Sequence, residues 1–198
     1  MKLCMTAALA LIATAGLAVA EPRPTPIRGE IDSYAPGQLR VISRAGEAID
    51  IKTPEDLQIV SLLPKTVSDI TVGNAVNTTT VPDGNGGLTA LQVSILPPGA
   101  GLQTGQRPSD VAPDSVMTTA TISGVAAATG GDQLTMTYDD QTVTVNVPSD
   151  VPVVAFGQGD ASLLQKGADI FAIGMTADDG TVSTDRVIAE TNGVKPPM

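Results

Sequence analysis

Residues 133–147 read Gln-Leu-Thr-Met-Thr-Tyr-Asp-Asp-Gln-Thr-Val-Thr-Val-Asn-Val, and this stretch decides the fold. Every second residue is apolar over 134–138, and the same alternation returns over 143–147 after three polar residues at 139–141. Because successive side chains of a strand point to opposite faces, each run has one apolar face and one polar face. Two such runs joined by a short polar segment predict a β-hairpin.

The same hairpin pattern occurs near residues 39–53, and comparing the two reveals an internal repeat. Over residues 49–93, a constant shift of 94 residues lays the first half of the chain on the second without a gap. Few residues are identical, but the shift keeps the apolar phase and matches prolines and glycines, such as Pro54 with Pro148 and Gly73 with Gly167. We therefore predict that the chain contains two copies of one β unit.

Each copy has the same predicted order of elements. A strand (near 27–33 and near 118–125) precedes the hairpin, and a short helical turn with a polar start follows it (66–71 and 160–165). Two more strands end each copy, near 74–81 and 88–96 and near 168–176 and 181–189. Three strands, a helical turn and two strands are typical of a small Greek-key barrel of the OB type. The predicted fold is all-β, with tandem OB-like domains at 27–96 and 116–191; a single merged β-sandwich is the alternative.

Three segments lie outside these units in the prediction. Residues 21–26 contain three prolines and are expected to be loose, as is the C-terminal tail at 192–198. Residues 97–115 are rich in Pro and Gly, carry no strand or helix pattern and are interpreted as a linker.

The first twenty residues have the pattern of a signal peptide. Lys2 precedes an apolar run over 3–17, and Ala18-Val19-Ala20 is a small-x-small cleavage signal, so cleavage is expected after Ala20. Cleavage would remove Cys4, the only cysteine, so no disulfide is expected. The expected location is the periplasm, with secretion as the alternative and without stable membrane insertion after cleavage.

Residues in the linker and tail resemble a known family. The residues that carry the resemblance are Thr104-Gly105, Pro108, Asp110, Pro113, Ser115, Met117-Thr118, Ala120-Thr121 and the final Gly-Val-Lys-Pro-Pro-Met at 193–198. Together they resemble a family of exported proteobacterial proteins of unknown function. The resemblance covers essentially the whole mature chain, and it implies two small OB-like β domains and export.

The composition excludes several classes of function. The 198 residues include no His, which removes the imidazole base of most catalytic triads and the commonest zinc ligand. A net charge of −10 argues against nucleic-acid binding, because phosphates would be repelled. Ser162 and Lys166 lie four residues apart, but no nucleophile motif surrounds them, so we interpret them as a capping serine and a surface lysine. No catalytic residue and no cofactor are predicted.

Two sets of residues remain as candidates for binding. Acidic turns could supply oxygen ligands to Ca²⁺, although Asp, Asn and Gly also favour turns for backbone reasons alone; the residues are Asp83, Asn85, Asp178 and Asp179. Polar residues of the linker could contact a partner, or the linker could serve only as a spacer; these are Arg107, Asp110 and Asp114. The function expected is that of a non-enzymatic, exported binding or interaction protein, with an envelope protein as its partner. The alternative is a divalent-cation (Ca²⁺) binding protein.

Overall fold

The computed structural model describes residues 23–84, 86–99, 103–128 and 130–196, and this part of the chain is all-β. The predicted signal peptide and its cleavage site at Ala20 lie outside the described residues. The strands are β1 (Arg23–Ala35), β2 (Gln38–Ser43), β3 (Ala48–Lys52), β4 (Gln58–Lys65), β5 (Ala75–Pro82), β6 (Leu88–Ile95), β7 (Gly105–Pro108), β8 (Val116–Ala128), β9 (Gly131–Tyr138), β10 (Gln141–Pro148), β11 (Val153–Gln158), β12 (Asp169–Thr176), β13 (Val182–Ser183) and β14 (Arg186–Ala189). The hairpin predicted over 133–147 is confirmed as β9 and β10, which pair antiparallel.

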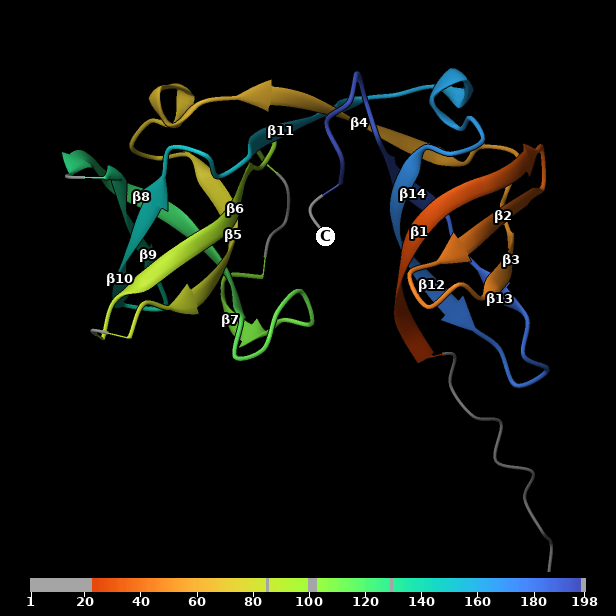
Figure 1. Ribbon diagram of the computed structural model, residues 1–198, viewed down its shortest axis with the longest axis horizontal. Helices are drawn as coiled ribbons and strands as arrows, with labels where there is room; N and C mark the ends of the chain where they lie inside the picture. The colour runs from red at the N-terminus through yellow and green to blue at the C-terminus, as the bar shows by residue number, and fades with distance from the viewer. Residues whose placement is uncertain (1–22, 85, 100–102, 129, 197–198) are drawn as a thin grey trace, which may run out of the picture.

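Strand pairing closes two separate rings, which Figure 1 shows side by side. In ring one the order is β1–β2–β3–β13–β12, and β12 pairs back onto β1. In ring two the order is β8–β9–β10–β6–β5, and β5 pairs back onto β8. Each ring encloses its own cluster of buried apolar side chains, with Leu39, Ile51 and Ile170 in ring one and Val93, Leu134 and Met136 in ring two. The pairing therefore does not form the single merged β-sandwich that was the alternative prediction.

Each ring is built from both halves of the sequence. Ring one combines β1–β3 with β12–β14, and ring two combines β8–β10 with β5 and β6. The predicted domain bounds at 27–96 and 116–191 are corrected accordingly, because the last strands of each half complete the other half's ring. In the described residues, strands lie where the sequence predicted them, with the segment at 181–189 divided into β13 and β14, and the neighbouring hairpins pair as expected, but the strands that close each ring come from the other half of the sequence.

The strands that carry the chain from one ring to the other are β4 and β11. They pair antiparallel with each other from Val60↔Gln158 to Lys65↔Val153, and Figure 1 shows them bridging the rings. An extended strand advances about 3.3 Å per residue, so eight residues of β4 cover about 26 Å, enough to leave one ring and reach the next. This extension is the physical reason why β5 and β6 do not fold back onto β1–β3.

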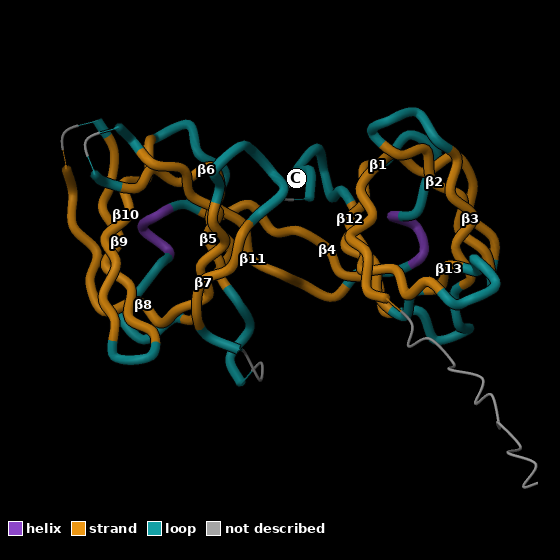
Figure 2. The backbone as a smooth tube through the Cα atoms, turned by 90° about the horizontal axis from the view of Figure 1, so that it is seen from below, coloured by secondary structure: helices purple, strands orange, loops and turns teal. Residues whose placement is uncertain are grey.

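A single turn of 3₁₀ helix lies against the core of each ring, where the sequence predicted short helical turns. The turn η1 (Val67–Asp69) places Val67 and the following Ile70 on the core of ring two, and η2 (Ala161–Leu163) places Leu163 and Leu164 on the core of ring one. The Asp160 carboxylate caps η2 by accepting a hydrogen bond from the Ser162 amide at 2.8 Å. In Figure 2 each turn lies within the outline of its ring.

The segments predicted to be loose or to act as a linker are partly ordered by pairing. Residues 23–26 of the N-terminal segment belong to β1 and pair with residues 173–176 of β12. Inside the predicted linker, β7 adds to the edge of β8. A sequence pattern could not show this, because a four-residue strand that contains a proline has no clear alternation.

The described part of the C-terminal tail is also held in place. Lys195 forms an ion pair with the buried carboxylate of Asp169, and hydrogen bonding to this carboxylate raises the pKa of Lys195. Pro196 is buried. Within the described residues, no helix is long and apolar enough to cross a membrane.

Candidate functional site

A cleft of about 520 Å³ lies between the two rings and is the candidate site. One of its walls is the outer face of ring one, and the other is the outer face of ring two with the segment that follows β7. The site therefore depends on residues that are distant in the sequence and that meet only because the rings stand side by side.

The wall from ring one is mainly apolar because β12 is apolar on both of its faces. Ile170 and Ala172 point into the ring and are buried, whereas Phe171 and Ile173 alternate with them and point outward. On β14, Ile188 lies directly across from Phe171 and extends the same wall. Ile173 is 45% exposed, so this wall keeps part of its apolar surface open to the cleft.

The wall from ring two carries polar side chains on β5 and β6 together with the apolar side chains of Leu96 and Met117. Asn77 of β5 pairs across the sheet with Ser94 of β6 and with Thr119 of β8, so these side chains form a row on the outer face. The Asn77 amide donates a hydrogen bond to the Thr119 hydroxyl at 3.3 Å. Ser94 and its neighbour on β6, Gln92, line the cleft and are buried at 2% and 8% exposure. The cleft therefore has one mainly apolar wall and one wall that mixes polar and apolar side chains.

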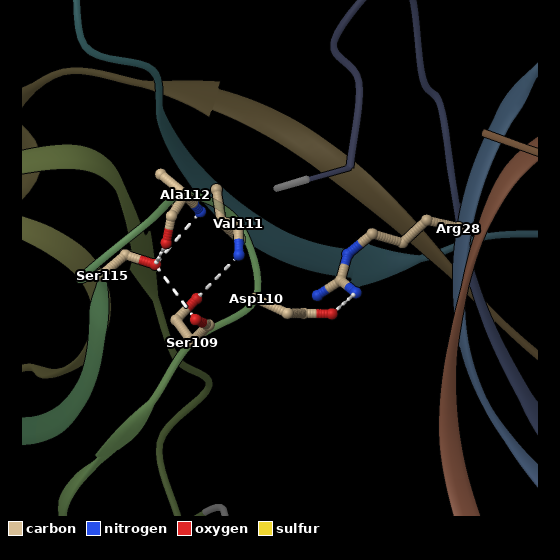
Figure 3. A network of polar contacts seen from close by, with 6 residues as sticks. All are labelled: Arg28, Ser109, Asp110, Val111, Ala112 and Ser115. Atoms are coloured by element: carbon tan, nitrogen blue, oxygen red, sulfur yellow. Dashed lines mark hydrogen bonds and ion pairs between the residues drawn. The ribbon is translucent and has the colours of Figure 1, made fainter. Parts of the chain in front are cut away.

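Arg28 of β1 stands at the boundary between the two walls. It alternates with the buried Ile27 and Gly29, so its side chain leaves the outer face of ring one. Its register partner is Phe171, and the guanidinium lies 4.8 Å from the centre of the Phe171 aromatic ring, within the range of a cation–π contact. Nη1 donates to the carboxylate of Asp110 at 2.6 Å, which joins ring one to the segment after β7 (Figure 3).

The loop at 109–115 holds Asp110 in place through hydrogen bonds of its own. Ser115 is 3% exposed, and its hydroxyl contacts the Ala112 carbonyl at 2.6 Å and the Ser109 carbonyl at 3.2 Å. The Ser109 hydroxyl accepts a hydrogen bond from the Val111 amide at 3.3 Å. Figure 3 shows this network on one side of the gap and Arg28 reaching across from the other. The fixed loop is what presents the Asp110 carboxylate to the guanidinium.

Two buried polar atoms of cleft-lining residues have no hydrogen-bond partner within the described residues. They are Nε of Arg28 and Oδ1 of Asn77. Leaving a buried polar group unpaired costs about 1–3 kcal/mol, more for a charged group, so native proteins keep few of them. Among the described residues, Thr53 and Thr79 also have unpartnered buried hydroxyl groups, and these two residues do not line this cleft.

The predicted linker residues fall into two groups. Arg107 and Asp110 line the cleft, whereas Asp114 is exposed in the loop at a φ of 57° and does not line it. Arg107 donates to the sulfur of Met117 at 3.3 Å and forms no ion pair with another described residue. The linker thus contributes directly to the site, in addition to joining the two halves of the sequence.

The predicted Ca²⁺ ligands take part in turns. The Asp83 carboxylate accepts a hydrogen bond from the Gly87 amide at 2.9 Å, and Asn85 lies outside the described residues. The Asp179 carboxylate accepts from the Thr181 amide at 2.8 Å, and this hydrogen bond lowers its pKa; Asp178 is exposed beside it. Among the described residues, no group of three or more acidic, His or Cys side chains could hold a metal ion.

Ser162 and Lys166 are not brought together as a catalytic pair. The Lys166 ammonium binds the Asp32 carboxylate at 2.8 Å, and the Ser162 amide is bonded to Asp160. Hydrogen bonding to Ser162 lowers the pKa of Asp160, and hydrogen bonding to Lys166 lowers the pKa of Asp32. Each of these groups has a structural role.

Sequence reasoning missed Arg28 and the apolar wall. A signal for the wall was available: residues 170–173 are apolar at every position, and a strand without alternation is one covered on both faces. No comparable signal marks Arg28, because its neighbours Phe171 and Asp110 are distant in the sequence.

Comparisons with protein-family models, with curated proteins and with solved structures found no match for this chain.

Proposed function

We propose that this chain is a non-enzymatic, exported binding protein and that the cleft between its two rings is the binding site. The observation that carries the proposal is a cleft of about 520 Å³ whose lining combines the apolar side chains of β12 and β14 with the charged side chains of Arg28, Arg107 and Asp110. Clefts of roughly 300–1,000 Å³ with an apolar lining and a few convergent polar groups are typical of small-molecule sites.

We further propose that both rings are OB-like barrels produced by a duplication. In each ring a three-stranded meander is closed by a pair of strands from the other half of the sequence and lies against a helical turn, the set of elements expected for this barrel. The two copies exchange their final strands. The antiparallel pair of β4 and β11 therefore connects the two rings that form the walls of the cleft. Export to the periplasm, as implied by the family resemblance and the first twenty residues, would place the site in the cell envelope.

A binding role fits the residues better than catalysis or cation storage. The carboxylates of Asp83 and Asp179 accept hydrogen bonds from backbone amides of their own turns. Lys166 is occupied by Asp32 and is not placed to activate a serine. By contrast, Arg107 forms no ion pair with another described residue, although it lines the cleft.

The test uses Nile red, a neutral apolar dye whose fluorescence rises on leaving water, and the chain from residue 21 onward. Ile173→Glu places a charge on the apolar wall, and Val125→Glu is the matched control, because Val125 is 40% exposed on a strand but does not line the cleft. We expect the wild-type chain and the control to bind the dye and Ile173→Glu to lose at least tenfold in affinity. Equal binding by the two variants, or none by the wild type, would contradict the proposed site.

A further inference from the structure

The charge around the cleft points to the kind of ligand. Two guanidinium groups, Arg28 and Arg107, line it together with one carboxylate, Asp110. The lining therefore carries one uncompensated positive charge, in a chain whose net charge is −10. A local excess of positive charge on a strongly acidic protein favours a ligand with a single negative charge.

The N–H donors of Arg28 indicate which negatively charged group of a ligand the cleft would bind. A guanidinium has five N–H donors in a plane, and a carboxylate can accept two of them along one edge. Only Nη1 of Arg28 is bonded within the described residues, to Asp110. Nε is buried without a partner, and Nη2 makes no hydrogen bond to another described residue. Nη2 is therefore the donor of Arg28 that remains for an acceptor such as a carboxylate oxygen.

The position of Arg28 is fixed before any ligand arrives. Its side chain is 11% exposed, lies over the ring of Phe171 and is held at Nη1 by Asp110. A group that is already ordered loses little conformational freedom on binding. Arg107 is exposed and contacts only the Met117 sulfur among the described polar partners, so its charge is free to approach a bound anion.

The apolar wall begins directly beside the guanidinium of Arg28. Phe171 lies next to Arg28 in register, Ile188 lies across from Phe171, and Ile173 follows in the next outward position of β12. A purely polar anion would leave the apolar wall in water. A neutral apolar molecule would leave Nη2 of Arg28 without an acceptor. Only a molecule with both parts matches the whole cleft.

Resting on the proposed function, we infer that the cleft binds a small amphipathic monocarboxylate. Its carboxylate accepts a hydrogen bond from Nη2 of Arg28, and the guanidinium of Arg107 adds a second positive charge at the cleft. Its apolar body lies against Phe171, Ile173 and Ile188. Asp110 keeps its ion pair with Nη1, the other terminal nitrogen of the Arg28 guanidinium.

The experiment measures displacement of Nile red by decanoate, a ten-carbon monocarboxylate, and by 1-decanol, which has the same chain without the charge. We expect decanoate to compete at least tenfold more strongly than 1-decanol on the wild-type chain. Arg28→Gln should weaken the binding of decanoate, measured directly by calorimetry, at least tenfold. Arg44→Gln is the matched control, since it removes the same charge from an exposed residue that does not line the cleft.

A second variant guards against misfolding of Arg28→Gln. Arg107→Gln changes an exposed side chain, and we expect it to weaken decanoate several-fold without lowering the melting temperature. Equal competition by decanoate and 1-decanol, failure of decanoate to displace the dye, or unchanged affinity in both arginine variants would overturn the inference. In each of these outcomes, loss of Nile red from Ile173→Glu would still support the cleft as a binding site. If Nile red does not bind, calorimetry with decanoate decides the inference directly.

Discussion

Replacing Ile170 by Ala tests the exchange of strands between the two rings. Ile170 lies on β12, in the second half of the sequence, and is completely buried in the core of ring one among residues of β1–β3. If strands were grouped by sequence halves, the same residue would support β8–β10. The two arrangements therefore predict that Ile170→Ala destabilises different strands.

The expected loss follows from the burial of Ile170. Ile→Ala removes three carbons, at about 0.8 kcal/mol for each buried methylene, and the cavity left behind raises the total to about 2–5 kcal/mol. Since each 1.4 kcal/mol is a tenfold change, a loss near 3 kcal/mol lowers protection of the affected amides about a hundredfold. We expect this loss in β1–β3, with a smaller change in β8–β10.

Hydrogen exchange read by mass spectrometry measures both regions in one sample. The mirror variant is Val93→Ala on β6, which is also completely buried and packs in ring two. It should lower protection mainly in β8–β10, although β6 comes from the first half of the sequence. If Ile170→Ala affected β8–β10 more than β1–β3, the strand exchange described here would be refuted.

Two further predictions concern a close backbone contact and an acidic cap. A Cβ on Gly29 would lie 2.0 Å from the Ile42 carbonyl oxygen, so Gly29→Ala should lower the melting temperature strongly. Gly124→Ala is the control, because its Cβ would lie 3.4 Å from Thr135 and should change the melting temperature little. Scanning calorimetry that found the same melting temperature for both variants would contradict this prediction. The pKa of Asp160 is lowered by hydrogen bonding to Ser162, so its contribution to stability is present above the ordinary value of 3.8 and is lost as the pH falls through the lower folded-state pKa. The melting temperature of the wild-type chain should therefore exceed that of Asp160→Ala near neutral pH, and this difference in melting temperature should shrink below about pH 3.8. A difference that stayed constant down to pH 2 would contradict the role of the cap.

The strands and turns could be predicted from the sequence because they depend on neighbours along the chain. Alternation over 133–147 fixes which side chains face a core, and the polar residues at 139–141 fix the turn. The polar residues Thr66 and Asp160 mark the starts of the two 3₁₀ turns for the same reason. The candidate site could be predicted only in part, since Arg107 and Asp110 stood out as charged residues in a Pro-rich segment, but their partners did not.

What the sequence by itself determined is the strands and turns, because periodicity, turn chemistry and capping act over a few residues. Only the tertiary structure decided which distant strands pair. The two halves share the same apolar pattern, so β5 and β6 meet an equivalent set of inward-facing residues in either ring, and the direction taken by β4 and β11 makes the choice. The cleft depends on that choice, because Arg28 and Asp110 are 82 residues apart and meet only when the exchanged strands bring the rings together.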